Sequence, residues 1–256
     1  MTSAPAPTYG PRYEEALSYA ARLHATQLRK AGPGTPPTIP YVAHLLEVSS
    51  LVWIGGGTET EAIAGLLHDA LEDQHEYTSS DEIARRFGDE VARIVEHCTD
   101  GEPGGERSER SWLERKIPYL IRLWSADPPE MLVTCADKIS NARAMVNDHA
   151  EVGDDLWNRF NATPPQIAWY YDEVTQAVEH SRPGQPLTKQ LRALADELRR
   201  LAGGRDALYG VPDDERATAE SALAKLAEAK QAALAKLEEA KLAEAKLAQA
   251  KLRATD

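Results

Sequence analysis

Apolar residues recur at the spacing of an α-helix along most of this chain, and no stretch alternates apolar and polar residues as a half-buried strand does. In the first such segment, for example, Ala16, Leu17, Ala20 and Leu23 fall on one face of a helix. Glycine and proline divide the rest of the chain into segments of helix length. The sequence therefore predicts an all-α fold, a helical bundle of irregular design.

Side-chain caps and breaker residues indicate where the helices begin and end. Thr58 followed by Glu61 is a capping box, and it opens a helix that we expect to run to about Asp73. Ser79 opens the next helix in the same way. Further helices are expected over 42–53, 109–125, 129–147, 164–180 and 187–202, with loops over 31–40 and 101–107.

The charge of the chain restricts its partners. The sequence holds 41 acidic and 29 basic residues and has a formal net charge of −12 at pH 7. Binding along nucleic acid needs a basic surface, so this composition argues against a nucleic-acid partner. An acidic protein that handles a phosphorylated ligand needs local positive charge, from a metal, an Arg/Lys pair, or both.

Cysteine usage and the first residues bear on location. Cys98 and Cys135 form neither a CxxC pair nor a disulfide framework, which favours a reducing compartment. The opening segment MTSAPAPTYG lacks the basic and apolar parts of a signal peptide. No apolar run approaches the roughly 20 residues that a membrane span needs. We therefore expect a cytoplasmic protein with no membrane partner.

The last part of the chain differs in composition from the rest. Residues 217–253 are almost all Ala, Lys, Leu, Glu and Gln, which are strong helix formers. Leucines recur there with a period of five, at Leu237, Leu242, Leu247 and Leu252. This period makes them spiral around a helix, so they form no coiled-coil seam. We expect a solvated helical tail or spacer, with a partner-docking helix as the alternative.

These observations divide the chain into three parts. Residues 1–11 are rich in Pro, Ala and Thr and are expected to be flexible. Residues 12–205 are expected to form one helical domain, and residues 206–256 a linker with a low-complexity helical tail. A chain of 256 residues suits one sizeable domain with such an extension.

One face of the helix that the capping box opens carries groups that suit metal binding. On a helical wheel His68, Asp69, Glu72 and Asp73 fall within about 140° of one another. That face carries no Lys or Arg, unlike most solvated faces, and one turn earlier it carries Gly65, which is small enough to admit another helix. An adjacent imidazole and carboxylate suit a divalent transition metal. The alternative is a solvated acidic face with an incidental histidine.

Two further segments supply what such a site lacks. His44 lies early in the helix expected over 42–53, among apolar neighbours, where a satisfied core histidine is the alternative. Asp137 lies in an otherwise apolar segment, where a buried carboxylate is costly unless a cation or donors are near. Together with the pair His68–Asp69 they would give two imidazoles and two carboxylates. Such a set leaves positions open for water and phosphate, as in a catalytic metal site.

Polar residues near these candidates suit a phosphorylated ligand. Arg29 and Lys30 end the first expected helix, where cations complement the helix dipole. Arg29 could equally bind a phosphate through two hydrogen bonds. Asn141 lies one turn after Asp137 on the same face.

The order of these motifs resembles the hydrolase domain of the RelA/SpoT family, and is most similar to the stand-alone small alarmone hydrolases of the Mesh1-like group. The matching segments are HATQLRK (24–30), PYVAH (40–44), GLLHDALEDQ (65–74), FGDEVARIVEHCTD (87–100), LERK (113–116) and CADKISNAR (135–143). The likeness runs from about residue 12 to residue 180, or to about 202 with the following helix. It implies an HD-domain helical bundle, to which the C-terminal helical extension is added.

The resemblance also implies an activity and residue roles. The activity is a Mn²⁺-dependent removal of pyrophosphate from the 3′ position of ppGpp or pppGpp, which gives GDP or GTP. By position, the metal ligands are His44, His68, Asp69 and Asp137; the pair that positions and activates water is Glu72 and Asp73; Arg29 and Lys30 contact substrate, and Asn141 contacts the ribose side.

Several alternatives remain open at the level of sequence. The same chemistry could act on another nucleotide, as an NADPH phosphatase or an adenosine-alarmone hydrolase, because Gln74 and the long loop before His44 depart from the family pattern. A sensing module that binds nucleotide without turnover is a third possibility, which the intact pair Glu72 and Asp73 disfavours. The aromatic run 169–171 is interpreted as core packing in preference to a substrate contact.

Overall fold

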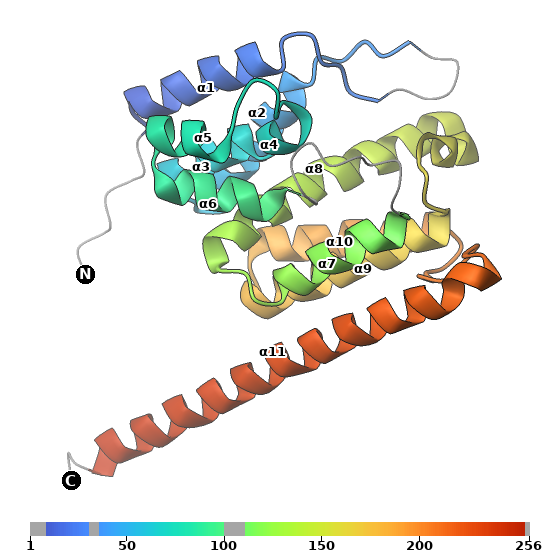
Figure 1. Cartoon of the computed structure of the whole chain (residues 1–256). Coiled ribbons are helices and arrows are strands. Elements are labelled where there is room, and N and C mark those ends of the chain that lie inside the picture. Colours follow the sequence, from blue (N-terminus) through green and yellow to red (C-terminus); the bar gives the residue numbers. More distant parts are fainter. Residues whose placement is uncertain (1–8, 31–35, 100–110, 254–256) are drawn as a thin grey trace.

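Every regular element in the described residues of the computed structural model is a helix (Figure 1). The structure describes residues 9–30, 36–99 and 111–253, with side chains up to residue 246. The expected all-α fold is confirmed. The helices are α1 (Pro11–Leu23), α2 (Val42–Ile54), α3 (Glu59–Leu67), α4 (Ala70–Asp73), α5 (Ser80–Phe87), α6 (Asp89–Cys98), α7 (Trp112–Leu123), α8 (Pro128–Val152), the 3-10 helix η1 (Gly153–Arg159), α9 (Pro164–Ser181), α10 (Pro186–Leu201) and α11 (Asp213–Arg253).

Some of the sequence predictions concern residues outside these ranges. These residues are 1–8 of the start predicted to be flexible over 1–11, 31–35 of the loop predicted over 31–40, and all of the loop predicted over 101–107. Within the described ranges, no helix combines the length and the apolar character that crossing a membrane requires.

The helix α8 runs through the middle of the molecule and connects its two halves (Figure 1). It contacts α2, α3 and α6 on one side and α9 and α10 on the other. Its 25 residues begin at a capping box formed by Asp127 and Glu130, with Pro128 in the first turn. Side chains on several faces of α8 are therefore buried, among them Met131 and Ile139.

The predicted helix starts are confirmed where side-chain caps mark them. The N–H of Thr58 donates to Glu61 Oε2 at 2.7 Å, and the Thr58 hydroxyl accepts from the N–H of Glu61, so this capping box is complete. Ser79 accepts from the N–H of Glu82 in the same way. These caps fix where α3 and α5 begin, and so they fix which face α3 turns toward the core.

The third predicted helix, over 58–73, is interrupted, so its prediction as one continuous helix is wrong. The backbone turns at His68 and Asp69, between α3 and α4. Nδ1 of His68 lies 2.9 Å from the carbonyl oxygen of Gly65, which in an uninterrupted helix would accept from the N–H of Asp69. The imidazole N–H of His68 therefore takes the place of that backbone donor at the Gly65 carbonyl.

Gly65 lets α2 and α3 lie close together, as its size predicts. A Cβ placed on Gly65 would lie 3.2 Å from the Cα of Ser49 in α2, closer than an unstrained contact. The Ser49 hydroxyl also donates to the carbonyl of Ala62 at 2.9 Å, one turn earlier in α3. These contacts set the distance between the helix that carries His44 and the helix that ends at His68.

The first part of α11 packs against the bundle. Ala219 and Leu226 are buried, and α11 lies along α7. The ammonium group of Lys230 lies 3.4 Å from Glu173 of α9. The prediction of a solvated spacer is therefore wrong for this part, because apolar side chains at helical spacing face α7. Further along, α11 extends past the bundle, and most side chains over 236–246 are exposed (Figure 1).

We predict that the substitution Gly65→Val destabilises the fold by about 1–3 kcal/mol, because its side chain must displace the backbone of α2. Helix propensity alone predicts a small gain, since valine is a better helix former than glycine. The measurement is urea unfolding, with Ala21→Val on the exposed face of α1 as the control for a β-branched residue in a helix. A Gly65→Val protein as stable as the original would contradict the close approach of α2 and α3.

Candidate metal centre

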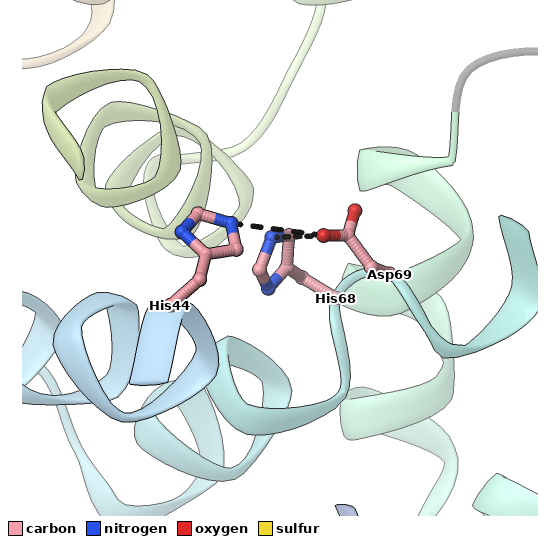
Figure 2. Close-up of side chains that lie close together, drawn as sticks. All are labelled: His44, His68 and Asp69. Carbon is pink, nitrogen blue, oxygen red and sulfur yellow. Dashed lines mark ion pairs between the residues drawn. The ribbon is translucent and has the colours of Figure 1, made fainter. Parts of the chain in front are cut away.

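Three segments far apart in the sequence bring four side chains of metal-ligand type together. α2 carries His44, the turn between α3 and α4 carries His68 and Asp69, and α8 carries Asp137. Figure 2 shows both imidazoles turned toward the carboxylate of Asp69. The centroids of the two imidazole rings lie 5.1 Å apart. The structure therefore brings together all four residues that the sequence selects as candidate ligands.

The distances between these side chains suit a shared cation. Nε2 of His68 lies 3.0 Å from Oδ2 of Asp69 and 3.5 Å from Oδ1 of Asp137. Nε2 of His44 lies 3.3 Å from the same oxygen of Asp137 and 3.7 Å from Oδ2 of Asp69. The ligand atoms of His44, His68 and Asp69 all lie within 4.8 Å of one another. Nitrogen and oxygen lone pairs thus converge on one small volume.

The tautomer of each neutral imidazole is fixed by the hydrogen bond of its other nitrogen. Nδ1 of His68 lies 2.9 Å from the carbonyl oxygen of Gly65, which can only accept, so Nδ1 carries the proton. Nδ1 of His44 lies 2.8 Å from the hydroxyl oxygen of Ser140. That hydroxyl donates to Glu47 at 2.6 Å, so it accepts from His44. In its neutral form each ring therefore presents the Nε2 lone pair to the site, and a bound metal would replace the proton that Nε2 of His68 otherwise carries.

These two Nε2 atoms indicate that a cation belongs here. Both are buried, and among the residues that the structure describes neither has a hydrogen-bond partner at acceptable geometry. Leaving a buried polar atom unsatisfied costs about 1–3 kcal/mol. One metal ion would satisfy both nitrogens at once, with the carboxylates as further ligands. The side chains present therefore fit a divalent metal.

Burial and neighbouring charges act on the pKa values of this cluster in opposite directions. Burial opposes charge on His68, but the carboxylates of Asp69 and Asp137 outweigh it and raise the pKa of His68 well above its usual value. Burial also opposes ionisation of Asp69, yet His68 outweighs it and lowers the pKa of Asp69. The pKa of Asp137 lies well below its usual value because Lys138 and the two imidazoles outweigh burial. Both carboxylates are therefore ionised at neutral pH and can act as ligands.

Two side chains that the sequence analysis did not select hold these carboxylates. The hydroxyl of Tyr41 donates to Oδ2 of Asp69. The ammonium group of Lys138 donates to Oδ2 of Asp137 at 2.7 Å. Lys138 directly follows its partner in sequence, and Tyr41 is three residues before His44. Their position beside candidate ligands is the signal that could have identified them.

Of the candidate substrate-binding residues, two join the cluster through Asp137. Asn141 donates its side-chain N–H to Oδ1 of Asp137, and its amide oxygen accepts from Arg29 at 3.1 Å. The prediction that Arg29 and Lys30 end the first helix is wrong, because α1 ends at Leu23. The N–H of Arg29 instead donates to the carbonyl of Ile39 at 2.9 Å, which holds this segment against the start of α2. Lys30 is exposed and takes no part in these contacts among the described residues.

The acidic pair follows the cluster on α4. Glu72 and Asp73 are both half-buried. Oδ2 of Asp73 accepts from the side-chain N–H of Gln27 at 2.8 Å. The amide oxygen of Gln27 in turn accepts from Gln74 at 2.7 Å and from Nδ1 of His24 at 2.7 Å. Gln27, which the sequence analysis did not select, therefore connects Asp73 to the segment after α1.

The aromatic run 169–171 is buried in the core, and the prediction that it packs there is confirmed. Its exposed fractions are 9% for Trp169, 5% for Tyr170 and 6% for Tyr171. The ring of Tyr170 lies 5.8 Å from the ammonium group of Lys138. The run therefore borders the candidate metal ligands through a cation–π contact with Lys138, which pairs with Asp137.

The fold and the site define the class of protein. A family model described as HD domain matches residues 16–164, which is more than half of the chain. The matched range contains all four candidate ligands and both acidic residues of α4. The chain belongs to the HD domain family.

Individual proteins that are similar in sequence can also be compared with this chain. The human guanosine-3′,5′-bis(diphosphate) 3′-pyrophosphohydrolase MESH1 is 35% identical over 131 residues, which cover 50% of this chain and 66% of the human protein. The guanosine-3′,5′-bis(diphosphate) 3′-pyrophosphohydrolase of Aquifex aeolicus is 34% identical over 140 residues, which cover 54% of this chain and 18% of that protein. The chain thus spans less than two thirds of the length of either relative.

A solved structure supports the same comparison. It is that of a metazoan orthologue of SpoT that hydrolyses ppGpp and plays a role in starvation responses. It matches this chain with a TM-score of 0.57 at 26% sequence identity. The match covers 77% of this chain and 98% of the solved one, so the helical arrangement is shared over nearly the whole of that protein.

We predict that Asp137→Asn abolishes stoichiometric metal binding, because a neutral amide replaces the carboxylate that faces both imidazoles. The measurement is elemental analysis after the protein is loaded with metal and dialysed. Asp172→Asn is the matched control, since Asp172 is also buried but pairs with Arg192 of α10. Full metal content in Asp137→Asn would exclude Asp137 from the ligand set.

Proposed function

We propose that this chain removes the 3′-pyrophosphate of the guanosine alarmones ppGpp and pppGpp in a metal-dependent hydrolysis, with GDP or GTP and pyrophosphate as products. One observation carries the proposal. His44, His68, Asp69 and Asp137 converge on one volume in a chain whose relatives are named for this reaction. The substrate is accordingly a small nucleotide.

The four converging side chains would hold the metal through two imidazole nitrogens and two carboxylates. A bound divalent ion supplies a water of lowered pKa and polarises a phosphoryl oxygen. A mixed set of nitrogen and oxygen ligands suits a divalent transition metal. We propose Mn²⁺ on the strength of the resemblance to RelA/SpoT hydrolase domains.

Glu72 and Asp73 are the proposed pair that orients the attacking water and accepts its proton. Both follow Asp69 within about one helical turn. Gln27 holds one oxygen of Asp73 at 2.8 Å, which restricts the orientation of that carboxylate. As the water oxygen bonds to phosphorus, a carboxylate takes its proton, and the bond from phosphorus to the ribose 3′ oxygen breaks. The carboxylic acid so formed gives up this proton, directly or through solvent, to the 3′ oxygen, which ends as a hydroxyl.

Arg29 and Lys30 are the proposed phosphate contacts, and Asn141 the proposed contact on the ribose side. The guanidinium of Arg29 lies 3.1 Å from Asn141, which also contacts Asp137, so it is close to the candidate metal ligands. A guanidinium binds phosphate oxygens in pairs. This local positive charge offsets the net charge of −12 that would otherwise repel a nucleotide.

We further propose that residues 12–205 form the hydrolase unit, to which the N-terminal segment 1–11 and the extension 206–256 are added. The family match over 16–164 lies within that unit. A cytoplasmic location is proposed because Cys98 and Cys135 are both free thiols, as in a reducing compartment.

The proposal is tested by measuring pyrophosphate release from ppGpp with Mn²⁺, with and without a chelator. A parallel assay measures phosphate release from NADPH. We expect pyrophosphate release that the chelator abolishes and added Mn²⁺ restores. Release of phosphate from NADPH without hydrolysis of ppGpp would contradict the proposed substrate and agree with the proposed metal-dependent chemistry. No activity on either nucleotide, with metal bound, would contradict the proposed enzymatic activity and favour a nucleotide-sensing module.

We predict that Glu72→Gln keeps its metal but lowers kcat on ppGpp by about 10²-fold or more, because the amide cannot accept a proton. Metal content and kcat are measured on the same preparation. Glu76→Gln, an exposed carboxylate shortly after α4, is the control and should leave kcat unchanged. Unchanged kcat in Glu72→Gln would remove Glu72 from the role of water activator.

A further inference from the structure

A chain of hydrogen bonds leads from the imidazole of His44 away from the other candidate metal ligands. Nδ1 of His44 donates to the hydroxyl oxygen of Ser140 at 2.8 Å, and that hydroxyl donates to Oε2 of Glu47 at 2.6 Å. The guanidinium of Arg143 donates to the other oxygen of Glu47 at 2.6 Å. His44 and Glu47 belong to α2, and the other two residues belong to α8. The bonds therefore cross between the two helices at every step.

The direction of each bond is fixed by chemistry. The ionised carboxylate of Glu47 can only accept, so the Ser140 hydroxyl must donate to it and accept from His44. His44 and Ser140 are almost fully buried, so solvent does not compete for the bond between them. Arg143 occupies the second oxygen of Glu47, which keeps the first oxygen directed at Ser140.

We propose that Ser140 and Glu47 are positioning residues for the metal centre: they hold the proton of neutral His44 on Nδ1 and direct its Nε2 lone pair at the cluster. Hydrogen bonding to an acceptor backed by a carboxylate also makes an imidazole a stronger ligand. The inference rests on the proposed function only in requiring that a metal binds at this site. Both residues would act through His44, so they are positioning residues and not catalytic ones.

The two imidazoles differ in how their orientation is secured. His68 donates to the backbone carbonyl of Gly65, which no side-chain substitution removes. Among the residues that the structure describes, the Nδ1 partner of His44 is the side chain of Ser140. Without that hydroxyl, the proton of His44 is no longer held on Nδ1, and a ring with its proton on Nε2 offers no lone pair to a metal. The contribution of these positioning residues can therefore be isolated by substitution.

The test measures the dissociation constant of Mn²⁺ for the full chain by titration calorimetry, without nucleotide. We expect Ser140→Ala to weaken Mn²⁺ binding by about 10–100-fold. The matched control is Thr188→Ala, which removes another buried hydroxyl, one that donates to the carbonyl of Arg182 between α9 and α10. Thr188→Ala should bind Mn²⁺ as the original chain does, even where it lowers stability.

The second arm asks whether Glu47 acts through Ser140. Glu47→Ala should also weaken Mn²⁺ binding, and the double variant should bind no more weakly than Ser140→Ala alone, because the two residues act in series. The side chain of Glu47 is 34% exposed, so Glu47→Ala carries the test if Ser140→Ala does not fold.

Several results would overturn the proposal. Mn²⁺ binding by Ser140→Ala or Glu47→Ala equal to that of the original chain would do so. Purely additive losses in the double variant, or an equal loss in Thr188→Ala, would show a general structural effect instead. A third outcome separates this proposal from the proposed function. If the original chain binds Mn²⁺ and the variants weaken that binding as expected, but ppGpp is not hydrolysed, the proposed function is contradicted and the role of Ser140 and Glu47 is upheld.

Discussion

The candidate metal centre depends on the close approach of α2 to α3 at Gly65. Because that position has no side chain, Ser49 of α2 lies against the backbone of α3, and the rings of His44 and His68 end 5.1 Å apart. Imidazoles and carboxylates buried this closely are costly without a cation to share. The packing of two largely apolar helices thus sets the geometry, and α8 completes the cluster by adding Asp137.

The sequence was sufficient to predict the all-helical fold and the residues that converge, for physical reasons. Capping residues mark helix starts with their own side chains, as Thr58 does for α3. A carboxylate in an apolar segment, such as Asp137, stands out because burying it needs a compensating charge. His44 carries a weaker signal, since a buried histidine is often a core residue. It joins the set as the second imidazole that such a site lacks, and the order of motifs along the chain supports that choice.

Other features depend on contacts that no local pattern contains. Ser140 and Glu47 are 93 residues apart, so their hydrogen bond cannot be read from spacing. The interruption after α3 follows from one side chain bonding to a carbonyl, which periodicity does not reveal. In α11, Ala219 and Leu226 do lie at helical spacing, but the five-residue leucine repeat that follows predicts exposure for the whole segment. The packing against α7 was missed for that reason.

The most direct test of the metal centre is anomalous X-ray diffraction from crystals of the full chain soaked with Mn²⁺. The account predicts a single strong anomalous peak within bonding distance of Nε2 of His44, Nε2 of His68 and the carboxylates of Asp69 and Asp137. A peak bound by other side chains, or none between α2, α3 and α8 while Mn²⁺ binds in solution, would contradict it.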